Sequence, residues 1–391
     1  MNPVVVISNL VFVLVGVATT MLGPLLPVHA ARFGLSDQQL GSLFLAQFFG
    51  GFAGSIVSTE LTKRCGLRTT IRLGLAVVAL GILGTTVHSL HIVLVSIALY
   101  GIGIGFCSPT ITAAVSDASP ANAAAALNVL NFSWGVGAIV AAPLLTHFSA
   151  VPRVGFIGTM AFVTALLAIS AALYPKLQEK VVSSTQPDRQ LSSGLLRFII
   201  ATGAVIFVYV GVENGVAGWL PTLADRVHHF SADRRAVLQG TFWTAFLGGR
   251  LLAPLVLRRI SEKTVLQTAI VLGLVGTLGI IVAHGPVSLF AAVSLTAFGF
   301  APIFPTTIAF LSQRLHGQAG ARLGWMFAAA GLGGAVVPYC VGYVSTITTR
   351  LLLGFSTLVL AELLLVVVNF ITSAQARRLQ EPEKASISAA C

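Results

Sequence analysis

Charged residues are scarce in this chain. Of its 391 residues only 9% are Asp, Glu, Lys or Arg, whereas 56% are hydrophobic. A soluble domain needs about 25% charged residues to cover its surface, so the mean hydropathy of +0.92 excludes an ordinary water-soluble fold. Most of the protein surface must face hydrocarbon, and we predict a protein that is embedded in a lipid bilayer.

Cysteines and catalytic motifs are also few. The four cysteines and the histidines stand in no paired or metal-ligand spacing. The string Gly101-x-Gly103-x-Gly105 lies within an apolar run with no strand before it, which excludes a phosphate-binding loop, and no Gly-x-x-x-x-Gly-Lys string for ATP is present. We therefore predict no disulfide, no metal, no bound cofactor and no enzymatic activity.

Long apolar runs are abundant instead. A helix that spans a bilayer needs about 20 predominantly apolar residues, and twelve runs of this kind occur. They lie at 4–28, 38–59, 70–88, 92–116, 122–147, 153–174, 196–222, 235–257, 264–284, 287–312, 320–345 and 350–372. We take each run as one transmembrane helix.

The chain also repeats itself at an offset close to 195 residues. Four glycines of the first half have counterparts in the second: Gly16 with Gly211, Gly23 with Gly218, Gly135 with Gly331 and Gly137 with Gly333. Such a repeat predicts two homologous membrane halves with a site between them. We predict an all-α fold with an N-terminal six-helix bundle at 1–174, a linker at 175–194, a C-terminal six-helix bundle at 195–373 and a tail at 374–391.

The net charge of +11 reflects topology. Sixteen of the 23 Lys and Arg residues fall in five segments that share one face if the spans alternate: 60–72, 175–197, 258–263, 314–322 and 374–391. The positive-inside rule places that face, with both chain ends, in the cytoplasm. The basic excess therefore indicates orientation in a bacterial-type inner membrane, and we expect no nucleic-acid partner.

Twelve spans in two halves joined by a polar linker resemble the major facilitator superfamily. In the loop after the second span, Arg64, Gly66 and Arg68 fit that family's pattern, although Lys63 stands where an acid is usual. The seventh span, residues 209–222, carries a Tyr-x-Gly-x-Glu string ahead of Trp-Leu, which is similar to the fucose permease and sodium-dependent glucose transporter branch. The resemblance implies two bundles that rock about a central cavity bordered by the seventh span.

Acids within the membrane need a reason, since a charge at a helix centre costs about 2.5–3.5 kcal/mol on insertion scales. Glu213 lies well inside the seventh span, with Tyr209 one turn away on the same face and Asn214 beside it. This carboxylate could accept sugar hydroxyls or bind a coupling ion, H⁺ or Na⁺, or it could join neighbouring helices in a structural role. For Glu362, in the twelfth span, we favour interhelical bonding.

Polar stripes on other spans supply further candidates. Gln239, Trp243 and Arg250 share one face of the eighth span, where an amide, an indole and a guanidinium would suit a polyol or an anion. The alternative for Arg250 is that its side chain extends to the membrane interface.

In the fifth span Asn128 and Asn131 share a face, and Trp134 follows one turn later. Amides and an aromatic ring suit a sugar, whose hydroxyls need both donors and acceptors, although amides also bond helices to one another. Gln47 and Trp325 are weaker candidates.

These features predict a secondary active transporter for a small polar solute, a hexose or a related sugar, that works by alternating access with H⁺ or Na⁺ coupled through Glu213. The sparse charge within the membrane agrees with a neutral solute. A drug or metabolite exporter is the alternative, although the fifth span lacks the Gly-Pro pair of such exporters. A membrane sensor would need a signalling domain. We expect a monomer.

Overall fold

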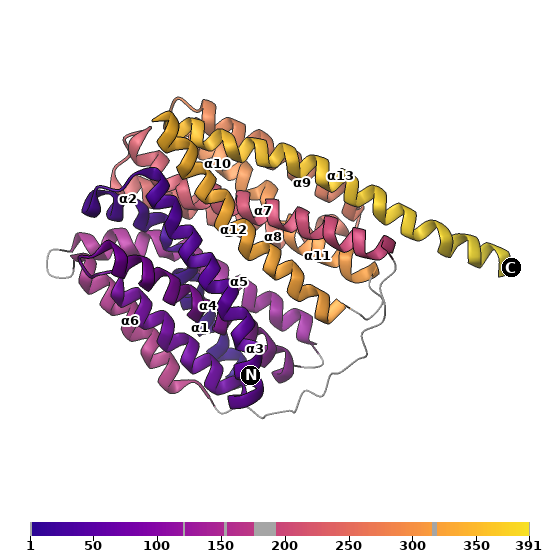
Figure 1. The fold of residues 1–391 in the computed structure, drawn as a ribbon, viewed down its shortest axis with the longest axis horizontal. Coiled ribbons are helices and arrows are strands. Elements are labelled where there is room, and N and C mark those ends of the chain that lie inside the picture. Colours follow the sequence, from indigo (N-terminus) through magenta and orange to yellow (C-terminus); the bar gives the residue numbers. More distant parts are fainter. Residues whose placement is uncertain (1, 120–121, 152–154, 176–192, 315–318, 391) are drawn as a thin grey trace.

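The computed structural model describes five stretches of the chain, 2–119, 122–151, 155–175, 193–314 and 319–390. Within them the chain forms thirteen α-helices and no strand (Figure 1). The helices are α1 (Pro3–Thr20), α2 (Leu22–Phe33), α3 (Asp37–Gly84), α4 (Leu90–Ala118), α5 (Ala123–Ala150), α6 (Gly155–Leu173), α7 (Ser193–Arg226), α8 (Ala232–Leu257), α9 (Glu262–Val282), α10 (Pro286–Phe300), α11 (Ile303–Arg314), α12 (Ala319–Thr348) and α13 (Leu351–Ala390).

The number of membrane crossings follows from how these helices join. Eleven segments of the described chain are long and apolar enough to cross a membrane. One of them, α3, contains two crossings, because Gly66 interrupts it with φ 80° and ψ 163°, a conformation that glycine adopts without strain. The pair α1 and α2 makes one crossing, and so does the pair α10 and α11. The prediction of twelve transmembrane helices is therefore confirmed.

The helices gather in two groups along the chain (Figure 1). Helices α1 to α6 pack mainly on one another, as do α7 to α13, and the groups meet where α3 contacts α12, α5 contacts α8 and α2 contacts α7. We call the face where α6 ends and α7 begins the linker face, and the face where α3 begins and α7 ends the distal face. Residues 176–192 of the predicted linker lie outside the described part, so the domain boundaries stay a prediction.

Matched glycines make matched helix contacts in the two halves. A Cβ atom on Gly137 of α5 would overlap the Val13 carbonyl of α1, and a Cβ on Gly333 of α12 would overlap the Phe207 carbonyl of α7. These contacts join the same pairs of spans that the sequence repeat relates. Small residues let backbones approach closely inside a membrane, where no hydrophobic drive holds helices together.

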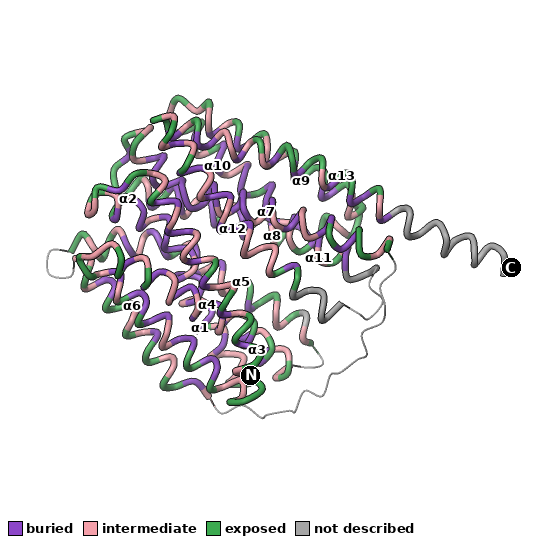
Figure 2. The backbone as a smooth tube through the Cα atoms, in the orientation of Figure 1, coloured by how far each residue is buried: buried purple, intermediate pink, exposed green. Residues whose placement is uncertain are grey.

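The distribution of burial separates the core from the lipid-facing surface (Figure 2). Buried positions lie where helices face one another, and exposed positions lie along the outer sides of the bundles. Large apolar side chains are prominent among the exposed ones: Leu10, Leu80, Val95, Val282 and Leu360 are all more than 60% exposed. Apolar exposure of this extent is expected where the solvent is hydrocarbon.

The glycine contacts can be tested by adding one methyl group. We expect Gly333→Ala to lower the melting temperature of the purified protein by several degrees, because its Cβ would overlap the Phe207 carbonyl, and overpacking costs about 1–3 kcal/mol. Gly248→Ala is the control, since nothing lies within 4 Å of its Cβ. It should leave the melting temperature unchanged or raise it. Equal melting temperatures for both variants would contradict close packing at Gly333.

Candidate functional site

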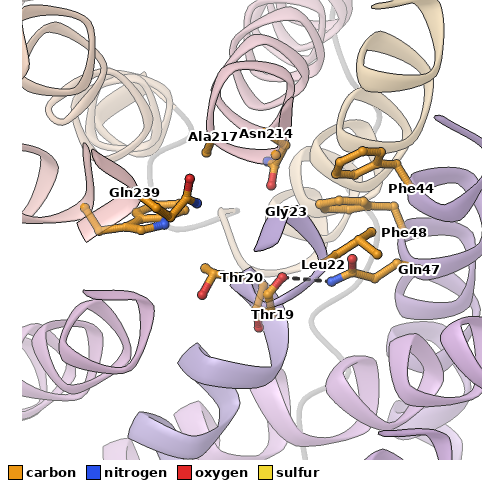
Figure 3. A pocket seen from close by; sticks show the side chains of 12 residues that line it. Thr19, Thr20, Leu22, Gly23, Phe44, Gln47, Phe48, Asn214, Ala217 and Gln239 are labelled. Carbon is orange, nitrogen blue, oxygen red and sulfur yellow. Dashed lines mark hydrogen bonds between the residues drawn. The ribbon is translucent and has the colours of Figure 1, made fainter. Parts of the chain in front are cut away.

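A small pocket lies where the two groups of helices meet (Figure 3). The space that the centre of a water molecule can occupy is about 20 Å³, which is room for about one water and too little for a sugar in this conformation. Its walls come from α1, α2, α3, α7 and α8. The lining residues are Thr19, Thr20, Leu22, Gly23, Phe44, Gln47, Phe48, Asn214, Ala217, Gly218, Gln239 and Trp243. They offer hydroxyls, amides and aromatic rings, and none of them is charged.

An interruption in the first crossing borders this pocket. Helix α1 ends at Thr20 and α2 begins at Leu22, and Pro24 cannot donate a backbone hydrogen bond to the preceding turn. Gln47 of α3 donates from Nε2 to the Thr19 carbonyl at 2.9 Å, the bond dashed in Figure 3. A helix interrupted inside a membrane needs such a side chain, because no bulk water is present to satisfy its carbonyls.

Several buried polar atoms of the pocket have no partner. Within the described chain Gln47 Oε1, Gln239 Oε1 and Trp243 Nε1 form no hydrogen bond, although each atom is buried. The two amide oxygens can only accept and the indole N–H can only donate. A buried polar group without a partner costs about 1–3 kcal/mol, so this set is suited to a guest that both donates and accepts, as hydroxyl groups do.

Aromatic rings form the wall between α5 and α8. The Trp134 ring meets the Trp243 ring edge to face, with 5.4 Å between centroids. Trp243 also contacts Phe242 and Phe246 of its own helix at 5.0 Å and 5.5 Å. These contacts hold the Trp243 indole at the edge of the pocket, where an apolar face and an N–H donor are both available to a ligand.

Glu213 forms a polar cluster beside the pocket. Its side chain is 8% exposed, and Tyr209 and Arg250 are close enough to interact with it electrostatically. Glu213 and Arg250 are not within ion-pair distance among the described residues. Arg250 instead lies over the Phe246 ring at 4.4 Å, and its Nε has no partner. The cluster therefore holds a buried acid and a half-buried base that are near each other but form no ion pair.

The structure brings only some of the predicted site residues together. Four of them line the pocket: Gln47, Asn214, Gln239 and Trp243. Trp134 contacts Trp243 from α5, while Tyr209, Glu213 and Arg250 form the neighbouring cluster and are not among the lining residues. Three others are exposed outside the pocket: Asn128, Asn131 and Trp325.

Glu362 and Asn131 each form a hydrogen bond within the protein. Glu362 is 1% exposed, and its Oε1 accepts a hydrogen bond from the Thr277 hydroxyl of α9 at 2.6 Å, which supports the interhelical interpretation. Asn131 donates to the Leu127 carbonyl of its own helix at 2.9 Å.

Sequence reasoning missed eight of the twelve residues that line the pocket. Thr19 and Thr20 form a polar pair in the first crossing and precede Pro24, a signal that could have placed them at a helix interruption. Phe44 and Phe48 share a face with Gln47 at helical spacing. In an apolar helix, however, two phenylalanines are indistinguishable from core residues until the neighbouring helix is known.

Comparison with known proteins identifies the family. The family model described as the Major Facilitator Superfamily matches residues 9–338. The chain is 21% identical over 346 residues to the glucose/mannose transporter GlcP of Bacillus subtilis, covering 85% of each protein. It is 23% identical over 384 residues to Bypass of stop codon protein 6 of Saccharomyces cerevisiae, covering 87% of this chain and 76% of that protein.

Solved structures share the fold. A D-xylose-proton symporter superposes with a TM-score of 0.77 at 16% identity, covering 92% of this chain and 96% of that one. The transporter FucP in its outward conformation gives 0.62 at 20% identity, covering 94% and 98%. A bacterial homologue of the lysosomal transporter Spinster, in an inward-facing conformation, gives 0.75 at 14% identity, covering 97% and 98%.

The two glutamines of the pocket should respond oppositely to an apolar replacement of similar length. Gln47→Met removes the donor to the Thr19 carbonyl, so we expect a lower melting temperature, by roughly 1 kcal/mol of stability or more. Gln239→Met removes a buried acceptor that has no partner, so the ligand-free protein should melt at the same or a higher temperature. Thermal unfolding in detergent measures both. An unaffected Gln47→Met variant would rule out a supporting role for this bond.

Proposed function

The chain belongs to the Major Facilitator Superfamily, and from that premise we propose that it is a secondary active transporter of a hexose or a related neutral sugar. The observation that carries the proposal is the pocket at the meeting of the two halves, whose polar lining is uncharged and whose buried amide oxygens and indole N–H lack partners. Three proteins similar to this chain are described as carriers of glucose and mannose, D-xylose, or fucose.

The chemistry of the pocket supports a neutral solute. A charged solute would need a fixed counter-charge, and the charged groups nearest to the pocket, Glu213 and Arg250, offset one another. Sugar hydroxyls could meet the free acceptors of Gln47 and Gln239, while an apolar ring face could lie against Trp243. The narrow pocket would widen as the two halves move, because both halves supply its walls.

For the coupling ion we propose H⁺, bound at Glu213. The cluster around this residue offers one carboxylate, the Tyr209 hydroxyl and the positive Arg250 guanidinium, whereas a hard metal cation is bound by several oxygen ligands. A proton needs only the carboxylate. Since Glu213 and Arg250 are near but unpaired, loss or gain of one proton changes the net charge beside the pocket, and the adjacent residue Asn214 lines it.

The orientation of the chain is part of the proposal. Sixteen of the 23 Lys and Arg residues fall in the five sequence segments that the alternating spans assign to one side of the membrane, the side of the predicted linker. We place this side and both chain ends in the cytoplasm of a cell with a bacterial-type inner membrane. We further propose that the protein acts as a monomer, with the bundles bounded at 1–174 and 195–373, the linker at 175–194 and the tail at 374–391.

A sugar panel and one conservative variant test the proposed site. In proteoliposomes with an inward proton gradient, we expect concentrative uptake of at least one of glucose, mannose, xylose and fucose. Trp243→Phe keeps the ring but removes the N–H, and should raise the KM for that sugar about tenfold, the equivalent of about 1.4 kcal/mol. Trp325→Phe is the matched control, because Trp325 is 72% exposed and is not one of the residues that line the pocket. Uptake of none of these sugars would refute the proposed substrate class.

The coupling proposal is tested by separating exchange from accumulation. We expect Glu213→Gln to abolish proton-driven accumulation, since a glutamine cannot take up or release a proton, while sugar exchange across the membrane without a gradient continues. Glu362→Gln should retain both activities, because its hydrogen bond to Thr277 can be made by an amide oxygen. Accumulation that survives in Glu213→Gln, or that follows a Na⁺ gradient in the wild type, would contradict proton coupling at this residue.

A further inference from the structure

The first turn of α3 lies against the ends of α7 and α12 at the distal face. We infer that Asp37 is the centre of a polar latch, formed with Arg226 and Ser345, that holds the two halves together at this face and must open when the site is exposed there. The inference rests on the proposed function in one respect only, namely that the halves move relative to each other. None of the three latch residues lines the pocket.

Both carboxylate oxygens of Asp37 are held by the opposite half. Oδ1 forms an ion pair with the Arg226 guanidinium at the end of α7, and Oδ2 accepts a hydrogen bond from the Ser345 hydroxyl of α12 at 2.5 Å. The Asp37 side chain is only 11% exposed. Removing one partner would therefore leave a largely buried carboxylate incompletely satisfied, which costs more than breaking an ion pair in water.

The neighbouring residue extends the same contact. The backbone N–H of Gln38 donates to the Thr346 hydroxyl at 2.8 Å, and its Nε2 donates to the Tyr339 hydroxyl at 2.9 Å. Backbone N–H groups in the first turn of a helix have no partner within the helix. One of the free donors of α3 is thus satisfied by α12, and separation of the halves would expose it.

Close backbone contact between α3 and α12 brings the latch residues within reach. A Cβ on Gly342 would overlap the Asp37 carbonyl, and a Cβ on Gly41 would lie 3.1 Å from the Tyr339 Cα. Between the latch and the pocket, Phe44 of α3 packs on Trp219 of α7, with 6.3 Å between the ring centroids. The latch, the glycine contacts and this aromatic pair are stacked between the distal face and the pocket.

The corresponding contact between α5 and α8 is much weaker. There Asp233, in the first turn of α8, lies 3.6 Å from His147, and both side chains are more than 60% exposed. Exposed pairs of this kind contribute about 0–1 kcal/mol. Arg32, the counterpart of Arg226 in the repeat, bonds within its own half to the carbonyls of Thr85 and Thr86. Among the described residues, the polar contacts between the halves at the distal face are therefore concentrated in the first turn of α3, at Asp37 and Gln38.

Distance measurements on purified protein test the latch without any transport assay. Val87 and Val287 are exposed near the distal face in opposite halves. In a variant whose native cysteines are changed to serine, both are replaced by cysteine and spin-labelled. We expect Asp37→Asn to raise the ratio of protein with a long label distance to protein with a short one about tenfold, as read by pulsed electron resonance. Arg226→Gln should act in the same direction.

The control is Asp225→Asn, which breaks the Asp225–Arg235 ion pair between α7 and α8 within one half at the same face. It should leave the label distances as in the wild type. Unchanged distances in both Asp37→Asn and Arg226→Gln would overturn the latch, and equal lengthening in Asp225→Asn would show general loosening of the distal face and overturn it too. If the distances change as expected but no sugar is transported, the latch stands and the proposed substrate class fails.

Discussion

The structure depends on one constraint, that backbone N–H and C=O groups in hydrocarbon must be satisfied within the protein. This requirement makes every crossing helical, and it leaves helix packing to small residues and a few polar contacts. Close glycine contacts join α1 to α5 in the first half and α7 to α12 in the second, at positions that the repeat relates. Some of the buried polar side chains join helices within one half, as Glu362 does with Thr277, and others border the helix interruption or the contact between the halves.

The candidate site arises where this rule is locally broken. The interruption between Thr20 and Leu22 leaves a carbonyl that Gln47 satisfies, and the same glutamine presents its free oxygen to the pocket. Gln47 therefore both satisfies a carbonyl at the helix interruption and offers a hydrogen-bond acceptor to the candidate site. Glu213 immediately precedes Asn214 of the pocket wall, so a carboxylate lies beside the pocket although no charged residue lines it.

The fold could be predicted from the sequence, whereas the residues of the site stay a prediction. The twelve crossings and the family are confirmed, because apolar runs of bilayer length and a long repeat are properties of the chain itself. Of the predicted site residues, Gln47 and Trp243 line the pocket, whereas Trp325 is 72% exposed. Helical periodicity shows which residues share a face, but not whether that face meets lipid, a neighbouring helix or the space between the halves.

The sequence by itself therefore determined that this chain is a membrane protein, how often it crosses, that it is built from two related halves and to which family it belongs. These properties follow from local composition and from the internal repeat, and both can be read from the sequence without knowledge of the fold. Only the tertiary structure decided that Trp134 meets Trp243 and that Asp37 meets Arg226, 189 residues away. Such pairs depend on how the faces of two separate bundles dock, and docking is set by the combined shape of many helices.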